Sequence, residues 1–399
     1  MRPLDALAKV CGDVRPGEPA EGVLGVEPAL VAAPENVTEA ADVMRVAAEN
    51  GLAVVPRGAE TRLDWGAPPE RCDLLVDTHR LDGLIEHAAG DLVAKAEAGL
   101  PMERLAEKLA ERDQRLALDV PLPGSTVGGT IATGAAGPLR SLYGTPRSLV
   151  IGLTIVRADG QVARSGGKVV KNVAGYDLGR LFSGSFGTLG LIVDATFRLH
   201  PVPAATAYVV CAVSGPEDAH DAVQTVLHCA VAPSAVEYIG PSGTVAVLLE
   251  GVPDGVAARA RQTADLLGEN AEISGTAPDG WGRYPDGTTL IDISAPPPAL
   301  RDLLTLLGPD IAVTWSGSGH GHVGLPAEST PDEVADVLGR LRDALGRHRG
   351  GAVVRYTPEE VRGEIDLWGP VPALALMRRV KDQFDPDHRL SPGRFAGGI

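Results

Sequence analysis

The sequence has few of the features that define several common protein classes. Only 36 of its 399 residues are lysine or arginine, against 52 aspartates and glutamates, which gives a formal net charge of −16. A chain of this charge repels phosphate backbones, which argues against nucleic-acid binding. Aromatic residues make up 4% of the chain, so recognition by ring stacking would depend on few side chains.

Cysteine is equally scarce. The four cysteines, Cys11, Cys72, Cys211 and Cys229, are far apart and form neither a C-x-x-C motif nor a cluster with histidine. This spacing gives no basis for a disulfide framework, a metal site or an iron–sulfur ligand set, and it favours a reducing cytoplasm. The N-terminal residues lack the apolar run of a signal peptide, and no stretch reaches the roughly 18 consecutive apolar residues of a membrane span. We therefore expect neither export nor membrane insertion.

The 399 residues are enough for two or three domains, and the pattern changes near two prolines. Before them, short apolar runs alternate with helical patterns, and Asp159-Gly160 between two alternating runs indicates a β-hairpin. At Pro201 and Pro203 the alternation stops, because proline cannot donate to a strand ladder. We expect a domain boundary there.

The part that follows repeats one order of elements. Residues 208–267 and residues 290–356 each have the pattern of a β-α-β-β-α-β unit, although no sequence repeat accompanies it. Such units form antiparallel sheets with helices on one face. The sequence therefore predicts an α+β second domain.

The chain has 49 glycines, and three clusters of them stand out in its first half, at Pro56–Thr61, Pro123–Thr130 and Ser183–Gly190. Each offers consecutive backbone N–H groups without Cβ obstruction, which suits a pyrophosphate in a protein with few cations. The alternative is that each is an ordinary turn. The second cluster belongs to the glycine-rich stretch Pro121–Pro138, which we expect to be a loop.

The familiar nucleotide motifs are absent. No G-x-G-x-x-G stands between a strand and a helix, and Gly166-Gly167-Lys168 is followed by Val169 instead of the Ser or Thr of a P-loop. A Rossmann nucleotide site is therefore disfavoured.

Four segments resemble a known family. They are residues 54–66, the loop PGSTVGGTIATGAAGP, the run GGKVVKNVAGYDLGRLFSGSFGTLGLIVDATFRLHP, and the terminal Ser391-Pro392-Gly393-Arg394. Together they resemble the FAD-linked oxidase family of vanillyl-alcohol-oxidase fold, and more narrowly the FAD-binding E subunits of bacterial glycolate oxidases. The resemblance covers residues 31–203 and about the last twenty, and the stretch 168–178 is its most specific part.

The resemblance implies an α+β architecture, with a two-subdomain PCMH-type FAD-binding domain and an α+β antiparallel-sheet cap domain. The expected division is a leader at residues 1–30, the FAD-binding domain at 31–203 and the cap or substrate domain at 204–356. Residues 357–399 would form a C-terminal segment that returns to the FAD-binding domain.

The same resemblance assigns FAD contacts by motif position. The expected contacts are Arg57, Gly58, Ala59, Glu60 and Thr61 for the pyrophosphate, Gly124, Ser125, Thr126, Gly128, Gly129 and Thr130 for the diphosphate and ribitol, and Gly187, Thr188, Gly190 and Ile192 for the adenosine. Some members tether FAD through a histidine in the first loop; here that loop has none, so we expect non-covalent FAD. A carboxylate at Glu60 would repel the pyrophosphate unless it turns away.

The candidate catalytic residues are His320, His322 and Arg394. The histidines occur in Gly317–His322, where larger relatives that oxidise 2-hydroxy acids carry an H-x-G-D-G-N-x-H-type segment, so an acid–base role is one hypothesis. Two nitrogens are too few for a metal site, and the residues taken alone favour a solvated loop pair. Arg394 could bind a substrate carboxylate bidentately or pair on the surface. Lys168 and Lys171 lie three apart on an expected helix, where they face either a flavin phosphate or solvent.

The resemblance implies a cytoplasmic FAD-dependent subunit that oxidises a small 2-hydroxy acid such as glycolate or D-lactate. Electrons would pass to a separate iron–sulfur subunit beside a second flavin subunit, and any contact with the membrane would be peripheral and through these partners. Two alternatives stay open: a non-catalytic FAD-binding subunit for assembly or electron relay, and a self-sufficient flavin oxidase of another alcohol or sugar.

Overall fold

The computed structural model describes residues 2–167 and 177–399, which form two units. The first comprises Met1–Ala136, Thr145–Val202 and Pro370–Ile399, and the second comprises Gly137–Gly144 and Pro203–Gly369. Lys168, Lys171 and most of the stretch 168–178 lie outside the described residues.

The observed division differs from the expected one in three places. Residues 1–30 do not form a separate leader, because their strand Val14–Pro16 pairs with Leu30–Ala32 in a sheet of the first unit. Gly137–Gly144 belongs to the second unit although the sequence places it within the first. Residues 357–369 also belong to the second unit, so that only the last thirty residues return to the first.

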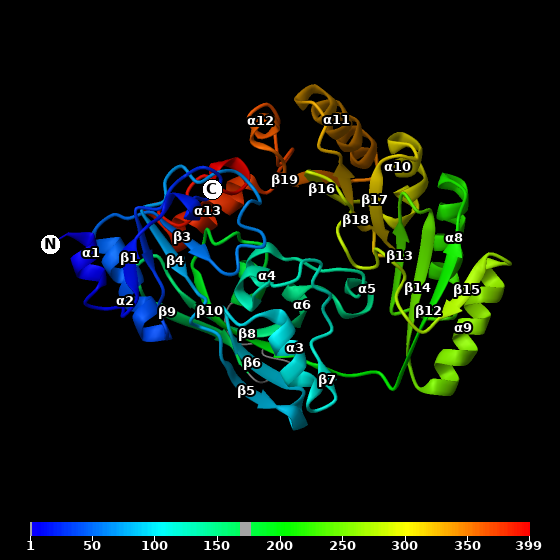
Figure 1. The fold of residues 1–399 in the computed structure, drawn as a ribbon, viewed down its shortest axis with the longest axis horizontal. Helices are drawn as coiled ribbons and strands as arrows, with labels where there is room; N and C mark the ends of the chain where they lie inside the picture. The colour runs from blue at the N-terminus through cyan, green and yellow to red at the C-terminus, as the bar shows by residue number, and fades with distance from the viewer. Residues whose placement is uncertain (1, 168–176) are drawn as a thin grey trace. The chain divides into compact units, whose positions relative to one another are not determined.

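Figure 1 labels most of the helices and strands. The helices are α1 (Pro3–Leu7), α2 (Val37–Glu49), α3 (Met102–Ala110), α4 (Val127–Thr133), α5 (Arg140–Tyr143), α6 (Pro146–Leu149), α7 (Leu178–Phe182), α8 (Pro216–His228), α9 (Pro253–Leu267), α10 (Leu300–Leu307), α11 (Pro331–Arg347), α12 (Glu359–Arg362) and α13 (Leu374–Phe384). The strands are β1 (Val14–Pro16), β2 (Leu30–Ala32), β3 (Val54–Arg57), β4 (Leu74–Asp77), β5 (Leu84–Ala88), β6 (Val93–Glu97), β7 (Gln114–Arg115), β8 (Val150–Val156), β9 (Val162–Gly166), β10 (Leu191–Arg198), β11 (His200–Pro201), β12 (Ala205–Ala212), β13 (Ala235–Ile239), β14 (Thr244–Gly251), β15 (Ala271–Ser274), β16 (Thr289–Ser294), β17 (Ala312–Ser316), β18 (His320–Leu325) and β19 (Gly351–Tyr356). Within the described ranges, no helix has both the length and the apolar character that crossing a membrane requires.

The first unit contains two larger sheets. In one, β2, β4 and β3 run parallel and β1 is antiparallel at the edge. Helix α2 begins at Asn36, whose side-chain oxygen accepts the N–H groups of Thr38 and Glu39 at 3.0 and 2.9 Å, and its apolar face packs on this sheet. The other sheet has the order β5-β6-β10-β8-β9 and is antiparallel throughout. The hairpin expected at Asp159-Gly160 joins β8 to β9 in this sheet.

Helix α4 corrects the expectation that Pro121–Pro138 is a loop throughout. The helix begins where Thr126 Oγ1 accepts the N–H of Gly129 at 3.2 Å, and it ends at Gly134 with φ of 67°. Glycine is required within it, because a Cβ at Gly128 would lie 2.9 Å from the Cβ of Ala98. The glycines therefore let a helix approach β6 closely.

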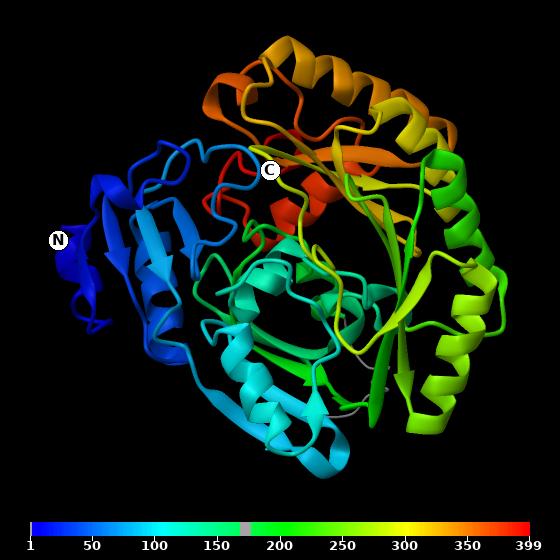
Figure 2. The same cartoon turned by 45° about the vertical axis from the view of Figure 1, so that its right-hand side comes forward.

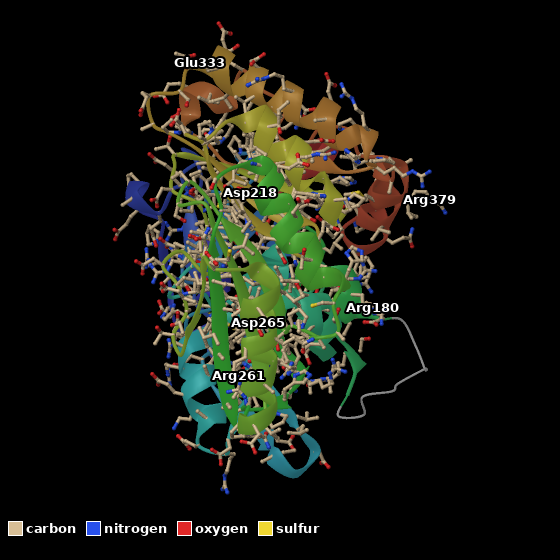
Figure 3. The ribbon with its side chains drawn as sticks, turned by 90° about the vertical axis from the view of Figure 1, so that its right-hand side faces the viewer. Arg180, Asp218, Arg261, Asp265, Glu333 and Arg379 are labelled. Carbon is tan, nitrogen blue, oxygen red and sulfur yellow. The ribbon has the colours of Figure 1, made fainter. Side chains whose placement is uncertain are left out.

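The second unit is built from two copies of one motif. Its sheet has the order β15-β12-β14-β13-β17-β18-β16-β19, and every pairing is antiparallel. Each half is a β-α-β-β-α-β unit, and the halves meet where β13 pairs with β17. Helices α8 to α11 lie along one face of the sheet (Figure 2), and Asp218, Arg261 and Asp265 are exposed on the outer side of α8 and α9 (Figure 3). The predicted α+β fold with an antiparallel second domain is confirmed.

A buried lysine fixes the end of the chain to the rest of the first unit. The ammonium of Lys381 on α13 donates to the Asp385 carboxylate at 2.7 Å and to the carbonyls of Thr188 and Leu390 at 2.8 Å. Neither side chain of the ion pair is exposed. Leu390 in turn forms an isolated parallel β-bridge with Val54, the first residue of β3. One cation thus connects α13, the third glycine cluster and the strand edge beside the first cluster.

We expect replacement of Lys381 by Met to lower the free energy of unfolding by about 3–5 kcal/mol, because a buried carboxylate would lose its partner. The measurement is urea unfolding of the purified protein. Lys108→Met is the matched control: its exposed pair with Glu111 should contribute no more than about 1 kcal/mol. Equal stability of the two variants would contradict the assigned role.

Candidate functional site

The first unit contains a cavity between its glycine clusters. Organic cofactors bind in concave sites of this kind. The expected FAD contacts that line the cavity are Arg57, Gly58, Ala59, Glu60, Thr61, Thr126, Gly128, Gly129, Gly187, Gly190 and Ile192. The structure therefore brings residues from all three glycine clusters, far apart in the sequence, to one wall.

Four expected contacts are not in that wall. Gly124 donates its N–H to Glu103 at 2.8 Å, and Ser125 is completely buried beneath the wall. The hydroxyl of Thr188 donates to the Ser185 carbonyl at 2.7 Å, while that of Thr130 is buried with no hydrogen-bond partner in the described part of the chain. Their roles toward FAD stay predictions.

Glu60 does not present its carboxylate to the cavity as an isolated negative charge. Its backbone has φ of 63°, and its carboxylate lies 2.9 Å from Nη1 of Arg57. Arg57 also pairs with Glu21 at 2.9 Å and with Asp77 at 2.6 Å. The Glu60 carboxylate is therefore ion-paired, on a guanidinium that it shares with Glu21 and Asp77.

Arg62 is a cavity residue that the sequence analysis did not single out. Its side chain is 7% exposed, and Nη1 donates to Ser125 Oγ at 2.9 Å. Thr61 Oγ1 is 3.3 Å from the same hydroxyl, and the Arg62 guanidinium lies 5.5 Å from the centre of the Trp65 ring. A guanidinium is thus held between the first and second glycine clusters. An arginine directly after a predicted phosphate loop was the available signal.

Arg394 also lines the cavity, and it is neither solvated nor on the surface. Its Nη2 donates to the carbonyls of Leu63 and Trp65 at 2.6 and 2.7 Å, and the residue is 4% exposed. This guanidinium therefore holds the chain that follows the first glycine cluster. Its expected role in binding a substrate carboxylate stays a prediction.

His320 and His322 lie on β18 of the second unit, which corrects the expectation of a solvated loop pair. Alternate residues of a strand point to one face, and the two imidazole rings meet edge to face at 5.1 Å. His322 is 9% exposed, and its Nδ1 lies 3.3 Å from Thr314 Oγ1 on β17. The pair faces away from the helices, on the same side of the sheet as Thr314 and Ser316.

An aspartate and an arginine from neighbouring strands complete this cluster. Asp292 on β16 stands opposite His322, and its Oδ1 is 3.3 Å from Nε2 of His320. Its Oδ2 accepts from Nε of Arg355 at 2.8 Å and also from Nη2. Arg355 occupies a β-bulge, because Val354 and Tyr356 pair with consecutive residues of β16. Bulges redirect side chains and are frequent beside functional sites.

Two residues outside the sheet also belong to the cluster. Arg140 at the start of α5 interacts electrostatically with Asp292, Tyr284 and Arg355, and its Nη1 is buried with no hydrogen-bond partner among the described residues. The Tyr284 ring meets His322 edge to face at 4.7 Å. We call Arg140, Tyr284, Asp292, His320, His322 and Arg355 the cap cluster.

The electrostatics of the cap cluster keep both imidazoles neutral. Burial, opposed by Asp292 and assisted by the positive charges of Arg140 and Arg355, lowers the pKa of His320 to about 4. Burial and the neighbouring His320 lower the pKa of His322 to about 3. Burial raises the pKa of the Asp292 carboxyl, but the Arg355 guanidinium outweighs that effect and holds it below its ordinary value, so Asp292 stays ionised. Asp292, His320 and His322 each offer one ligand atom, and these atoms lie within 4.8 Å of one another. A metal ion is therefore one candidate ligand of the cap cluster.

The comparisons agree with these features. The model of the family "FAD binding domain" matches residues 28–166, and that of "FAD linked oxidases, C-terminal domain" matches residues 368–395. The chain is 30% identical to D-2-hydroxyglutarate dehydrogenase of Xanthomonas citri pv. viticola, over 92% of this chain and 89% of that one. It is 27% identical to glycolate oxidase subunit GlcD of Bacillus subtilis, over 92% and 89%, and 36% identical to subunit GlcE of Escherichia coli, over 38% and 44%. The structure of p-cresol methylhydroxylase with substrate bound superposes with a TM-score of 0.76 at 14% identity, covering 98% of this chain and 96% of that one.

The residues of the cavity fit the FAD that these matches indicate. A Cβ at Gly58 would lie 2.5 Å from Thr126 Oγ1, so the first and second clusters approach as closely as glycine allows. The glycine clusters and Arg62 would hold the FAD diphosphate.

We expect Arg62→Gln to weaken FAD binding about 10- to 100-fold, because a hydrogen bond to a charged group contributes roughly 1.5–3 kcal/mol. The measurement is flavin fluorescence during titration of the apoprotein. Arg71→Gln removes the same charge from an exposed position of the same unit and is the control. Unchanged affinity in Arg62→Gln would show that Arg62 does not contact the cofactor.

Proposed function

Because this chain belongs to the FAD-linked oxidase family with a PCMH-type FAD-binding domain, we propose that it oxidises a small 2-hydroxy acid such as glycolate or D-lactate. It does so as an FAD-dependent oxidoreductase subunit that binds FAD non-covalently. Electrons leave to a separate iron–sulfur partner. The relatives named for glycolate and D-2-hydroxyglutarate support the substrate class, since both compounds are 2-hydroxy acids.

The observation that carries this proposal is the contact between Asp292 and His320. Nε2 of His320 faces the Asp292 carboxylate at 3.3 Å, which favours a proton on Nε2 and a lone pair on Nδ1. At neutral pH the ring is uncharged, because burial lowers its pKa to about 4. His320 therefore has the protonation state that a general base requires.

Oxidation of a 2-hydroxy acid removes a proton from the hydroxyl oxygen and a hydride from the carbon that bears it. Nδ1 of His320 takes the proton, and the O–H bonding pair becomes the second bond of the product carbonyl. Bound FAD supplies the acceptor for the hydride. Asp292 stabilises the imidazolium that results, as a carboxylate does for the histidine of a hydrolase triad.

The positions of the cysteines support a separate electron acceptor. Cys11 and Cys72 lie in different hydrophobic cores of the first unit, and Cys211 and Cys229 belong to the second unit. An iron–sulfur cluster needs several cysteine ligands around one centre. We assign the clusters to a partner subunit, and the similarity to glycolate oxidase subunits supports a complex that includes a second flavin subunit.

The test is anaerobic reduction of the flavin in the isolated chain by a panel of glycolate, D-lactate, L-lactate and D-2-hydroxyglutarate. Bleaching of the flavin absorbance by one or more of them supports the proposal. A flavin that stays oxidised with every compound until partner subunits are added would indicate an assembly or relay subunit. Rapid oxygen consumption by the chain alone would indicate a self-sufficient oxidase.

We expect His320→Gln to slow flavin reduction by the best substrate about 100-fold or more, because general base catalysis contributes roughly 10²–10⁴-fold. Stopped-flow absorbance under anaerobic conditions measures the rate. His348→Gln is the control, since His348 is a half-exposed histidine of the same unit that pairs with Asp302. If both variants reduce at the wild-type rate, His320 is not the base.

A further inference from the structure

The cap cluster offers sites for both a cation and an anion, and its charges decide between them. Asp292 contributes one negative charge, and Arg140 and Arg355 contribute two positive charges, so the guanidinium groups outnumber the carboxylate whatever the protonation of the two imidazoles. A buried site of positive charge favours an anion and opposes a divalent cation.

The geometry of Asp292 leads to the same conclusion. Its Oδ2 accepts from Nε of Arg355 at 2.8 Å and from Nη2, and its Oδ1 faces Nε2 of His320 at 3.3 Å. A metal ion would have to displace His320 from one oxygen and lie close to a guanidinium at the other. The three possible ligands are thus already engaged with one another and with Arg355.

Arg140 has a buried hydrogen-bond donor that no described residue satisfies. Its Nη1 is buried and has no hydrogen-bond partner in the described part of the chain, and burial lowers its pKa. A buried guanidinium nitrogen without a partner is costly unless an acceptor reaches it. Carboxylate oxygens match guanidinium geometry, since two N–H groups of one fork can bind one carboxylate.

We propose that the cap cluster is a metal-free binding site for the carboxylate of the substrate, held by Arg140 with the bulge residue Arg355. The position of Arg140 supports the same assignment. Its segment, Gly137–Gly144, belongs to the second unit although it interrupts the first in sequence. Leu139 and Tyr143 pack on Ala235 and Leu248, which anchors Arg140 at the edge of the cluster. This inference rests on the proposed function for the identity of the substrate, but not for the binding of an anion.

The test uses oxalate, a two-carbon carboxylate that has no hydroxyl carbon to oxidise, and calorimetric titration of the FAD-loaded protein. We expect oxalate to bind one site per chain, and Arg140→Gln and Arg355→Gln each to weaken that binding about 10- to 100-fold. Arg301→Gln is the matched control, because Arg301 lies half-exposed on α10 of the same unit and pairs with Glu217. It should change the oxalate Kd less than about two-fold.

A double variant distinguishes loss of binding from loss of folding. Arg355→Gln alone leaves the Asp292 carboxylate without its guanidinium partner and can destabilise the protein. The double variant Arg355→Gln with Asp292→Asn removes both charges of the ion pair together. Weak oxalate binding by a double variant with wild-type thermal unfolding supports the anion site. Wild-type oxalate affinity in Arg140→Gln and in the double variant would overturn it. Stoichiometric binding of Zn²⁺ or Mn²⁺ that is lost in His320→Gln would also overturn it, in favour of a metal.

The outcomes distinguish this inference from the proposed function. If oxalate binds as expected and no hydroxy acid reduces the flavin, the anion site stands and the proposed reaction fails. If hydroxy acids reduce the flavin with the same KM in wild-type, Arg140→Gln and Arg355→Gln proteins, the reaction stands and the anion site fails.

Discussion

The buried ammonium of Lys381 is the interaction on which the FAD cavity depends. The cavity wall combines chain segments near residues 57–63, 126–133 and 186–192 with Arg394. Loops of glycine have little side-chain packing of their own, so something else must hold their backbone in place. Lys381 does this by satisfying the carbonyls of Thr188 and Leu390 from a completely buried position, and Asp385 compensates its charge.

Ion pairs and backbone donors together explain how a chain of strongly negative net charge can accommodate the FAD diphosphate. Arg57 is surrounded by Glu21, Glu60 and Asp77, so its charge serves to hold the first glycine cluster and β4 together. Arg394 holds carbonyls of the chain that follows that cluster. We expect backbone N–H groups of the glycine clusters, together with Arg62, to contact the diphosphate of FAD. Few cations are needed when the polypeptide backbone provides most of the donors.

The features that could be predicted from the sequence are local ones. The glycine clusters, the hairpin at Asp159-Gly160 and the two β-α-β-β-α-β units each depend on neighbouring residues, and all could be identified before the fold was known. Helix α4 was missed because two glycines among its seven residues, with a third at its C-cap, outweigh the capping signal of Thr126 in a local analysis. The cap cluster was missed for a different reason. Its residues meet through the pairing register of β16, β18 and β19, which a local analysis of the sequence does not provide.

The duplicated second unit explains why the polar site forms in one half only. Both halves have the same succession of elements, so each has an open face opposite its helices. Over the first half that face carries the apolar Ala235 and Leu248, which Leu139, Tyr143 and Trp281 cover. Over the second half the corresponding face carries His320, His322 and Asp292, which a hydrophobic cover would leave without partners. The same short segment that covers the first half delivers Arg140 to the edge of the second. One insertion therefore both covers apolar residues of the first half and supplies a positive charge at the edge of the second.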